Sequence, residues 1–308
     1  MSTTLLPPQD RLVRADDLDL SDFPTTQATI APPYKHLSLR NLDPANALGI
    51  GLMHLGCLGV LFTPFSWWSV GLAAFLWWAC GGLGVCLCYH RLLTHRSFKT
   101  PKAVEYFLSI LGTMNWQGGP IKWVGTHRLH HKHSDQEMDP HSPHHGFNWA
   151  HILWCFMTDP PGINARDAAK DLQRDKGMVL IDRFHYLPQL VLALAVFAAG
   201  YLVAGWGMAF AFVVWAVCIR TVFTFHATWF VNSAAHTWGY QRYQTGDDSK
   251  NNWWVALISF GEGWHNNHHH SQRSAAHGQK WWEIDLTYWT IRLMGVVGLA
   301  KQIVPVKH

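Results

Sequence analysis

The hydrophobic positions of this chain gather in four uninterrupted stretches. They span residues 47–63, 67–89, 187–204 and 207–231. A helix needs about 20 apolar residues to cross a hydrocarbon core of about 30 Å, and each stretch reaches or nearly reaches this length. Only short turns separate the first stretch from the second and the third from the fourth, so the pattern predicts two hairpins of transmembrane helices. Buried helices of a soluble protein are the alternative, which the uncharged turns disfavour.

The distribution of basic residues gives the hairpins an orientation. Residues 91–183, between the two hairpins, hold 12 of the 24 Lys and Arg residues, whereas the two short turns hold none. Since basic loops stay in the cytoplasm, we expect both termini and this central segment on the cytoplasmic side. Arg220 alone is a basic residue inside a predicted span. The formal net charge of +4 fits a surface near anionic headgroups and gives no reason to expect nucleic-acid binding.

The polar parts of the sequence complete the predicted architecture. Residues 1–46 are polar and mixed in charge, which is typical of a flexible or surface-lying cytoplasmic arm. Residues 47–308 show no repeat and no domain boundary. We therefore expect one all-α, multi-pass membrane domain, with four transmembrane helices under a cytoplasmic helical cap. Within the cap, residues 285–303 predict an amphipathic helix lying on the membrane or against the cap.

Histidine is far more frequent than in an ordinary protein, with 21 among 308 residues. Three segments concentrate it: HRLLTH at 90–95, HRLHHKH at 127–133 and HNNHHH at 265–270. A fourth feature, NSAAH, ends at His236. The predicted topology places all four on the cytoplasmic side of the membrane, at the inner boundary.

The spacing within these segments places several imidazoles on one helix face, because positions i, i+3 and i+4 lie together on a helix surface. Two triplets have this spacing: His127, His130 and His131; His265, His268 and His269. Asn232 and His236 are four residues apart and share a face in the same way. His133 and His270 turn away from their triplets by about 120° or more, so we expect His270 not to be a ligand.

His90 and His95 are five residues apart, so they need not face the same way and can reach two different metals. With them the segments provide nine imidazoles, too many for one ion and enough for two. Imidazole suits Fe, Zn, Cu and Ni, so the pattern predicts a cap that carries a two-metal site. Asn232 is placed to hold a water near it. A ligating ring usually donates its other N–H to a carboxylate or carbonyl. The carboxylates nearest in sequence are Asp135, Glu137, Asp139 and Glu262.

The remaining histidines are interpreted more plainly. Seven are expected at the surface or in packing positions: His36, His54, His151, His185, His226, His277 and His308. Three lie in the polar loop DPHSPHH, which is interpreted as lying outside the site although it can hold a stray metal: His141, His144 and His145.

The histidine segments resemble the boxes of the membrane fatty acid desaturases, in particular the Δ9 or stearoyl-type branch. That family carries H-x-x-x-x-H, H-x-x-H-H and H-x-x-H-H boxes, here HRLLTH, HRLHH and HNNHH. The similarity extends over about residues 37–299 and includes SDQEMDPH, NSAAH and GEGWHNNHH. It implies a centre of two Fe²⁺ ions, with Asn232 acting through a water. The ligands that it implies are His90, His95, His127, His130, His131, His236, His265, His268 and His269.

The resemblance also implies a reaction. It is the O₂-dependent insertion of a cis double bond, expected at Δ9, into a saturated C16–C18 acyl chain, with two electrons from an external donor. An unactivated methylene is inert to side-chain acids and bases, so the oxidising chemistry belongs to the cofactor and no catalytic residue beyond the di-iron centre is expected. The protein's part is to hold two adjacent carbons at the metal in an apolar tunnel that excludes water.

Tunnel residues follow from the same resemblance. The family lines the bend of its acyl tunnel at positions that correspond here to Gln117, Trp123, Thr228 and Trp229. The closed end carries an aromatic residue on the second span, followed four residues later by a small one. Trp78 and Gly82 match these positions, and an indole there would limit chain length by steric exclusion. Ordinary lipid-facing or core packing is the other interpretation of Trp78.

One departure from the family bears on the substrate carrier. Animal acyl-CoA desaturases have Arg-Asp immediately before the second box, where these residues bind the CoA head group. This chain has Gly125 and Thr126 there, and Gly118 where that branch places an asparagine. A charged fork that clamps phosphate is therefore missing. The form WVGTHR resembles plant and cyanobacterial desaturases, several of which act on glycerolipids, so we expect an acyl-lipid substrate over acyl-CoA.

Partners and alternatives complete the prediction. The HPGG motif of a fused cytochrome b5 domain does not occur in the chain, so we expect a separate electron donor, ferredoxin or cytochrome b5. Fatty acyl hydroxylation on the same di-iron scaffold is the alternative reaction. A histidine-rich metal transporter or sensor is the alternative class, but such a protein should place ionisable residues along its spans, whereas these clusters lie beyond the span ends.

Overall fold

The computed structural model describes residues 41–159 and 163–306, and all of them belong to one compact unit. Over these ranges the chain is helical, and no strand forms; backbone pairing between segments is limited to isolated bridges such as Lys99 with Lys301. The prediction of an all-α fold is therefore confirmed. Residues 1–40 of the predicted arm lie outside the described part, so the division at residue 46 stays a prediction.

Thirteen α-helices occur in the described ranges. Their bounds are α1 (Pro44–Cys57), α2 (Trp67–Leu76), α3 (Lys102–Thr113), α4 (Pro120–His133), α5 (Phe147–His151), α6 (Lys170–Gln173), α7 (Lys176–Arg183), α8 (Leu187–Val213), α9 (Arg220–Asn232), α10 (Ala234–Thr237), α11 (Trp253–Ile258), α12 (His265–His270) and α13 (Leu286–Val296). Three other helical segments matter for the site. They are the π-helices η4 (Trp77–Thr94) and η8 (Val214–Ile219), and the 3₁₀-helix η7 (Ala165–Ala169).

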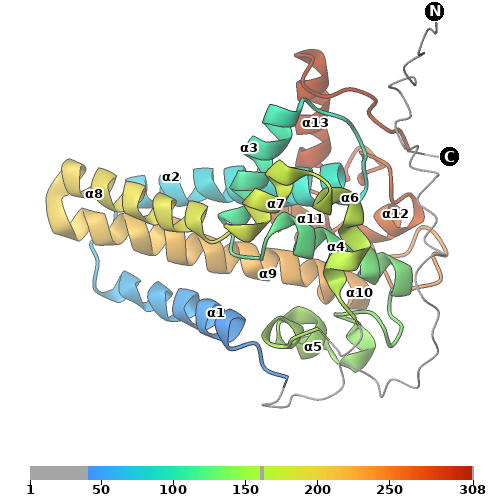
Figure 1. The fold of residues 1–308 in the computed structure, drawn as a ribbon, viewed down its shortest axis with the longest axis horizontal. Coiled ribbons are helices and arrows are strands. Elements are labelled where there is room, and N and C mark those ends of the chain that lie inside the picture. The colour runs from blue at the N-terminus through green and yellow to red at the C-terminus, as the bar shows by residue number, and fades with distance from the viewer. Residues whose placement is uncertain (1–40, 160–162, 307–308) are drawn as a thin grey trace, which may run out of the picture. The chain divides into compact units, whose positions relative to one another are not determined.

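Three continuous helical stretches are long and apolar enough to cross a membrane: Pro44–Leu61, Trp67–Thr94 and Leu187–Thr237. The third stretch contains the last two predicted segments. They are separated at Ala204 and Gly205, where the backbone leaves helical geometry. Gly205 has a φ of +71°, which glycine adopts without a steric penalty, and the chain doubles back there (Figure 1). All four predicted apolar segments are thus helical, arranged as four limbs.

The second apolar limb changes its hydrogen-bond pattern halfway along. Helix α2 gives way at Trp77 to η4, in which N–H groups bond five residues back. At the end of η4, the N–H of His95 donates to the carbonyl of His90 at 3.1 Å. Such π-helical turns are rare and occur mostly at functional sites. Here the altered winding ends on the first predicted histidine segment.

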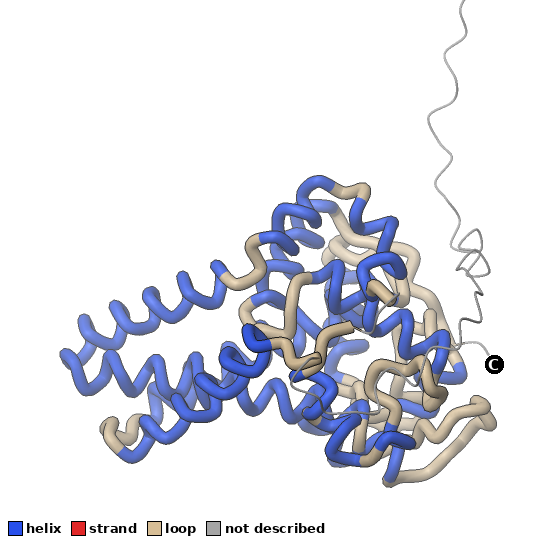
Figure 2. Tube along the Cα trace, turned by 60° about the horizontal axis from the view of Figure 1, so that its bottom comes forward, coloured by secondary structure: helices blue, strands red, loops and turns tan. Residues whose placement is uncertain are grey.

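The remaining helices gather at one end of the four limbs (Figure 1), and most loops lie there as well (Figure 2). A buried core joins this region to η4. It contains Leu87, Leu93, Ile121, Val124, Met178 and Ile291, from η4, α4, α7 and α13. Helix α13 fulfils the expectation of a helix within residues 285–303, since it buries Ile291 while Leu293 and Val296 stay exposed. The side of the membrane on which this region lies stays a prediction.

Arg220, the basic residue predicted inside a span, is buried. Its Nε donates to the Ala216 carbonyl at 3.1 Å, and its guanidinium donates to the Met114 carbonyl at 2.8 Å. It also donates to Oδ1 of Asn115 at 3.0 Å and to Oε1 of Gln189 at 2.9 Å. No carboxylate within the described residues pairs with it. This polar node joins α8, α9 and the segment that follows α3.

Replacing Arg220 with methionine should destabilise the fold, because it leaves the Asn115 and Gln189 oxygens buried without a donor. Each such acceptor costs roughly 1–3 kcal/mol. We expect the unfolding temperature of the detergent-solubilised protein, followed by circular dichroism, to fall by more than about 5 °C. Arg183→Met, at an exposed position, is the matched control and should leave it unchanged. If the two variants had the same unfolding temperature, the hydrogen bonds of Arg220 would not contribute to the packing of the apolar helices.

Candidate metal centre

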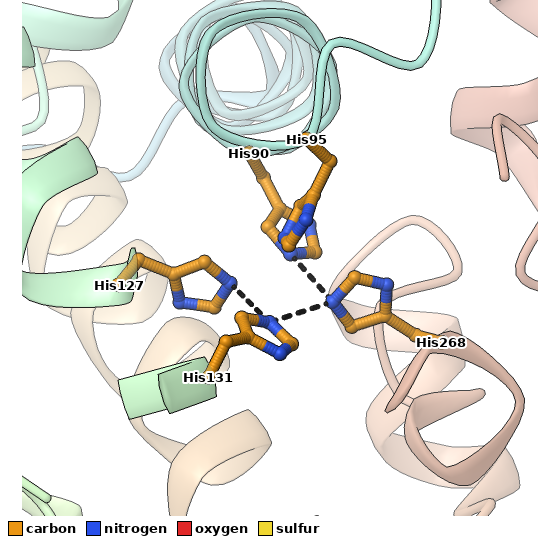
Figure 3. Close-up of side chains that lie close together, drawn as sticks. All are labelled: His90, His95, His127, His131 and His268. Carbon is orange, nitrogen blue, oxygen red and sulfur yellow. Dashed lines mark hydrogen bonds between the residues drawn. The ribbon is translucent and has the colours of Figure 1, made fainter. Parts of the chain in front are cut away.

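Nine histidines from η4, the residue that follows it, α4, α10 and α12 converge in two adjacent clusters. The first cluster comprises His90, His95, His127, His131 and His268 (Figure 3). The second cluster comprises His130, His236, His265 and His269. Within each cluster the candidate ligand nitrogens all lie within 4.8 Å of one another. The structure therefore brings together all nine histidines that were predicted as ligands. His270 belongs to neither cluster; its exposed ring stacks on Tyr243 at 3.8 Å.

The two H-x-x-H-H boxes divide their histidines between the clusters in opposite ways. In each box the i, i+4 pair enters one cluster and the i+3 residue enters the other: His127, His131 and His130 in α4; His265, His269 and His268 in α12. The triplets were predicted to share one face. Positions i+3 and i+4 lie on opposite sides of position i, about 100° apart, so one helix face serves two neighbouring ions.

His90 and His95 both enter the first cluster, which decides between the alternatives that their spacing left open. In an α-helix, residues five apart point about 140° away from each other. Because the N–H of His95 bonds to the carbonyl of His90, the two residues instead sit one π-helical turn apart. Their ring centroids are 4.7 Å apart. The π-helix thus directs both rings to the same place.

The nitrogen positions in the first cluster fit a shared metal ion. Nε2 of His131 lies 3.0 Å from Nε2 of His127 and 3.0 Å from Nε2 of His268. Nε2 of His268 lies 3.2 Å from Nε2 of His90 (Figure 3). Two nitrogens bound at about 2.1 Å to one ion, at a right angle, lie about 3.0 Å apart. The spacing is therefore that of ligands around one ion.

The second cluster has the same spacing. Nε2 of His265 lies 3.0 Å from Nε2 of His236 and 3.0 Å from Nε2 of His269. In addition, Nε2 of His95 in the first cluster and Nε2 of His130 in the second are buried and have no hydrogen-bond partner in the described part of the chain. Buried polar atoms normally have a partner, so these nitrogens also fit metal ligation.

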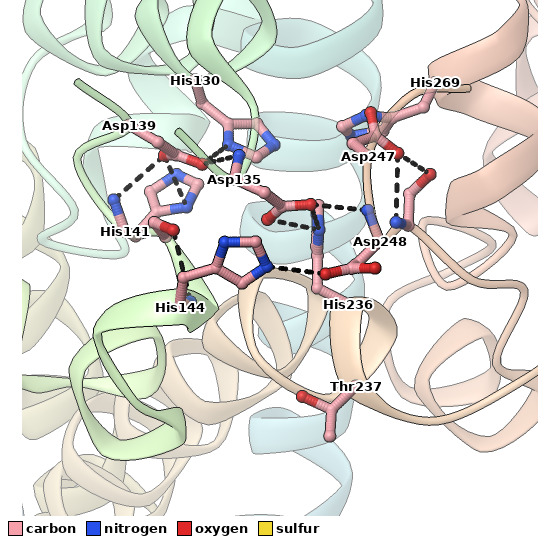
Figure 4. A network of polar contacts seen from close by, with 12 residues as sticks. His130, Asp135, Asp139, His141, His144, His236, Thr237, Asp247, Asp248 and His269 are labelled. Atoms are coloured by element: carbon pink, nitrogen blue, oxygen red, sulfur yellow. Dashed lines mark hydrogen bonds and ion pairs between the residues drawn. The ribbon is translucent and has the colours of Figure 1, made fainter. Parts of the chain in front are cut away.

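Carboxylates hold the outer nitrogens of four cluster histidines. The Nδ1–oxygen contacts are His90 to Glu262 at 2.6 Å, His130 to Asp139 at 2.9 Å, His236 to Asp135 at 3.1 Å and His269 to Asp247 at 2.6 Å. Figure 4 shows the last three. An Nδ1–H that donates to a carboxylate leaves the Nε2 lone pair for a metal. Of the predicted carboxylates, only Glu137 is exposed and contacts no described cluster histidine. Asp247 was not among the predicted carboxylates, because it lies in a polar loop that is distant in sequence from the histidine boxes.

Burial keeps at least four of the cluster imidazoles neutral. It lowers the pKa of His127, His131, His265 and His268 well below the usual range, and neighbouring imidazoles lower each of these pKa values further. Neutral imidazole is the form that binds metals. At neutral pH these side chains are therefore ready to act as ligands without first losing a proton.

Glu262 anchors the first cluster to the core. Burial alone would raise the pKa of its carboxyl, but the Arg91 guanidinium and His90 hold that pKa well below its usual range. Arg91 Nε and Nη2 both donate to Oε1 of Glu262 at 3.0 Å. Arg91 also pairs with Asp285 at 2.9 Å. The carboxylate that orients His90 is thus held by a fully buried charge network.

Two histidines predicted outside the site are buried beside it. His277, predicted at the surface or in packing, has Nδ1 3.0 Å from Oε2 of Glu262. His141, predicted in a loop outside the site, has Nδ1 3.6 Å from Oδ1 of Asp139 (Figure 4). Single histidines give no sequence signal of this kind, because each lies far in sequence from the carboxylate or ring that it contacts in the fold.

Three further histidines predicted as surface or packing residues form a chain between helices. Nε2 of His54 in α1 lies 3.2 Å from Nε2 of His226 in α9. Nδ1 of His226 lies 2.9 Å from Nε2 of His151 in α5. His151 in turn contacts the Ser233 hydroxyl at 3.0 Å. They are packing residues in the sense that they join α1, α5 and α9, and they lie outside both clusters.

Two cavities adjoin the first cluster. The inner cavity, of about 50 Å³, runs along η4 and α9 and is lined by apolar groups with His90 and Glu262 at one end. The outer cavity, of about 590 Å³, opens beside α1 and α4. Four residues line both cavities: Trp123, His127, Thr228 and Asn232. The two cavities therefore share lining residues beside the histidines, next to Asn232, and this shared part is called the junction.

The residues predicted at the tunnel bend lie at this junction. Nε2 of Gln117 donates to the Thr228 hydroxyl at 3.0 Å, and Nε1 of Trp123 donates to Oε1 of Gln117 at 3.2 Å. Gln117 and Trp229 line the outer cavity. These bonds satisfy the polar groups among themselves, so the junction presents mainly apolar surfaces to a chain that passes through it.

The two residues predicted at the closed end lie outside the lining of both cavities. Trp78 is 42% exposed and lines neither cavity, and the backbone of Gly82 packs beside Phe260. Trp77 and Gly81 line the inner cavity instead, at the end remote from His90. Trp77 and Gly81 are also four residues apart, but each lies one position before the predicted residue. One position along a helix turns a side chain by about 100°, so residues 77 and 78 point in different directions.

Gly125, where the predicted departure from acyl-CoA desaturases occurs, is tightly packed. A Cβ at this position would lie 1.9 Å from the Ala165 carbonyl oxygen of η7. Real Cβ atoms do not approach so closely, so η7 can lie against α4 only because residue 125 has no side chain. An arginine at this position would have to displace η7.

The comparisons with known proteins agree with this site. The family model of the fatty acid desaturases matches residues 65–294. An sn-1 stearoyl-lipid 9-desaturase of Anabaena variabilis is 48% identical over 253 residues, 82% of this chain and 90% of the relative. An sn-2 palmitoyl-lipid 9-desaturase of Nostoc sp. (strain 36) is 44% identical over 264 residues, 84% of this chain and 89% of the relative.

A relative with another carrier is also similar. An acyl-CoA 5-desaturase of Anemone leveillei is 40% identical over 296 residues, 93% of this chain and 88% of the relative. The family model covers all the histidine boxes and three of the four apolar limbs. The comparisons confirm the resemblance that the histidine boxes predicted, and this chain belongs to the fatty acid desaturase family.

Proposed function

We propose that this protein is an acyl-lipid desaturase that inserts a cis double bond at Δ9 into saturated C16–C18 chains. The observation that carries the proposal is the convergence of nine histidines beside the junction of two cavities. The names of two relatives, a stearoyl-lipid and a palmitoyl-lipid 9-desaturase, support both the lipid carrier and the position of the bond.

Each cluster holds one iron ion in this proposal, with the nine histidines as ligands and Asn232 acting through a water. The donor set supports it, since imidazole suits iron and the outer carboxylates fix the ligand tautomers. When bound, the irons would supply the O₂-dependent oxidation of two adjacent unactivated methylenes, in which O₂ is reduced to two waters by two electrons from the acyl chain and two electrons from a donor. Ferredoxin or a cytochrome b5 is the proposed donor.

The chain's own residues bind and orient the acyl chain. Gln117, Trp123 and Thr228 form the hydrogen-bonded junction between the cavities, so an acyl chain must turn there beside the first cluster. Its end then enters the inner cavity towards Trp77. A turn of fixed position presents one pair of carbons to the metal side, and the apolar lining excludes water from it.

Four transmembrane spans in two hairpins carry this site in the proposal, with the cap on the cytoplasmic side. The apolar limbs and the reversal at Gly205 support the two hairpins. The basic central segment supports the orientation. The outer cavity then opens near the membrane boundary, where a glycerolipid can enter without leaving the bilayer.

The packing of Gly125 supports an acyl-lipid carrier over acyl-CoA. An arginine before the second box, as in animal acyl-CoA desaturases, would collide with Ala165 in η7. This chain therefore has no charged side chains at this position that could hold the phosphates of a CoA carrier. The similarity to an acyl-CoA 5-desaturase keeps acyl-CoA as the alternative that the experiment must separate.

Product analysis tests the proposal directly. Membranes from a host that lacks the activity should convert saturated C16–C18 chains to cis-Δ9 monoenes when O₂ and reduced donor are present. Lipids separated by class before methyl-ester analysis should show the new bond in glycerolipids before it enters the CoA pool. A monoene that appears first in acyl-CoA would contradict the lipid carrier, and hydroxy acids in place of monoenes would identify a hydroxylase.

The ligand assignment predicts a contrast between two neighbours on α12. His265→Ala removes a nitrogen from the second cluster, so the purified variant should retain about one iron or fewer and lose the activity. His270→Ala should retain two irons and most of the activity, because His270 is exposed and lies outside both clusters. Iron per chain is measured by plasma emission spectroscopy. Equal iron in both variants would contradict the assignment.

Chain-length preference predicts a contrast between two adjacent tryptophans. Trp77→Ala should lengthen the inner cavity at its remote end and shift the products towards longer chains, such as C20. Trp78→Ala removes an indole of the same size from an exposed position and should leave the profile unchanged. The profile is measured by gas chromatography of methyl esters after feeding mixed saturated acids. A shift in Trp78→Ala alone would return the closed end to residue 78.

A further inference from the structure

We propose that His277 and His141 are positioning residues, one for each metal cluster. Each contacts, from outside, the carboxylate that orients a ligand histidine, and each lies against a ligand ring. The inference rests on the proposed function, in that the nine clustered histidines are taken as the ligands. It assigns a role to two histidines that the sequence pattern placed outside the site.

His277 contacts the first cluster in two ways. Its Nδ1 lies 3.0 Å from Oε2 of Glu262, the same oxygen that contacts Nδ1 of His90 at 2.6 Å. Its ring centroid lies 4.3 Å from that of His268, with the planes inclined by 31°. Since Arg91 occupies the other oxygen of Glu262, His277 completes the set of contacts that prevents this carboxylate from rotating.

The position of His277 is itself fixed by the backbone. Its N–H donates to Oδ2 of Asp285 at 2.8 Å, and its carbonyl accepts from Nδ2 of Asn267 at 2.8 Å. Asn267 belongs to α12, between His265 and His268. The segment that carries His277 is therefore joined to the ligand helix and to the Arg91–Asp285 pair, which a packing residue alone would not require.

His141 repeats the arrangement at the second cluster. Its Nδ1 lies 3.6 Å from Oδ1 of Asp139, whose other oxygen contacts Nδ1 of His130 at 2.9 Å (Figure 4). Its ring centroid lies 4.4 Å from that of His130, with the planes inclined by 35°. The backbone N–H of His141 donates to Asp139 at 3.1 Å as well. Thus each cluster has one ligand, one carboxylate and one outer histidine in contact.

The outer histidines act through orientation and through the electron density of the carboxylate. A carboxylate offers about four lone-pair sites, so one that faces a ligand imidazole can still rotate or take up a different donor. Nδ1 of His277 and Nδ1 of His141 have no hydrogen-bond partner among the described residues, so the outer histidine acts by contact: its polar edge lies beside the carboxylate and its ring lies against the ligand ring, which restricts this freedom and keeps the ligand's Nδ1–H bonded. The contact of His141 with Asp139 is longer than that of His277 with Glu262, so its effect should be smaller.

The test uses the purified full-length protein in detergent, loaded with ⁵⁷Fe and examined by Mössbauer spectroscopy. The two clusters offer different numbers of histidines, so the wild type should give two distinguishable iron signals. His277→Leu should change the signal of the first cluster and weaken its iron retention against a chelator by on the order of 10-fold, leaving the second unchanged. His141→Leu should do the reverse with a smaller change.

Conservative variants separate positioning from packing. His277→Asn and His141→Asn place an amide N–H donor near the position of Nδ1 and should restore the wild-type signal in part. His270→Leu, on the exposed side of α12, is the control and should leave both signals unchanged. Variants that alter both signals equally, alter neither, or fail to differ between leucine and asparagine would overturn the inference. A wild type that does not bind two irons would instead contradict the proposed function.

Discussion

The gathering of nine imidazoles in one largely buried place is the constraint on which the rest of the structure depends. Each ring has two nitrogens that need partners, and water cannot supply them there. Outer carboxylates satisfy the Nδ1 side of four rings. The Nε2 side is left directed inward, where only a metal ion can satisfy so many lone pairs at once. The buried Arg91 network exists to keep one of these carboxylates charged and in place.

The cavities lie on the apolar side of these histidines. The histidines close the inner end of the cap, and the two cavities meet beside them at the junction formed by Gln117, Trp123 and Thr228. The polar groups of this junction bond to one another, so they offer few free donors or acceptors to whatever occupies the cavities. Most residues that line the cavities are therefore different from the histidines of the clusters, although both sets lie on the same helices.

Much of this was predictable from local pattern, because apolar length and box spacing act within one helix. The helical class and the nine clustered histidines follow from such short-range rules, as at His127 and His131. What the local pattern left open or did not reach depends on winding or on distant contacts. The shared direction of His90 and His95 needed the π-helix, and the lining role of Trp77 in place of Trp78 needed the helix phase. His277 and Asp247 meet the site only through the fold, so no local pattern marks them.

The opposite division of the two boxes has a mechanical consequence. Helix α4 gives two histidines to the first cluster and one to the second, and α12 does the converse. A small shift of either helix therefore moves ring nitrogens in both clusters at the same moment, and neither cluster can be adjusted alone. Because α4 and α12 each contribute to both clusters, these two helices together set the distance between the clusters.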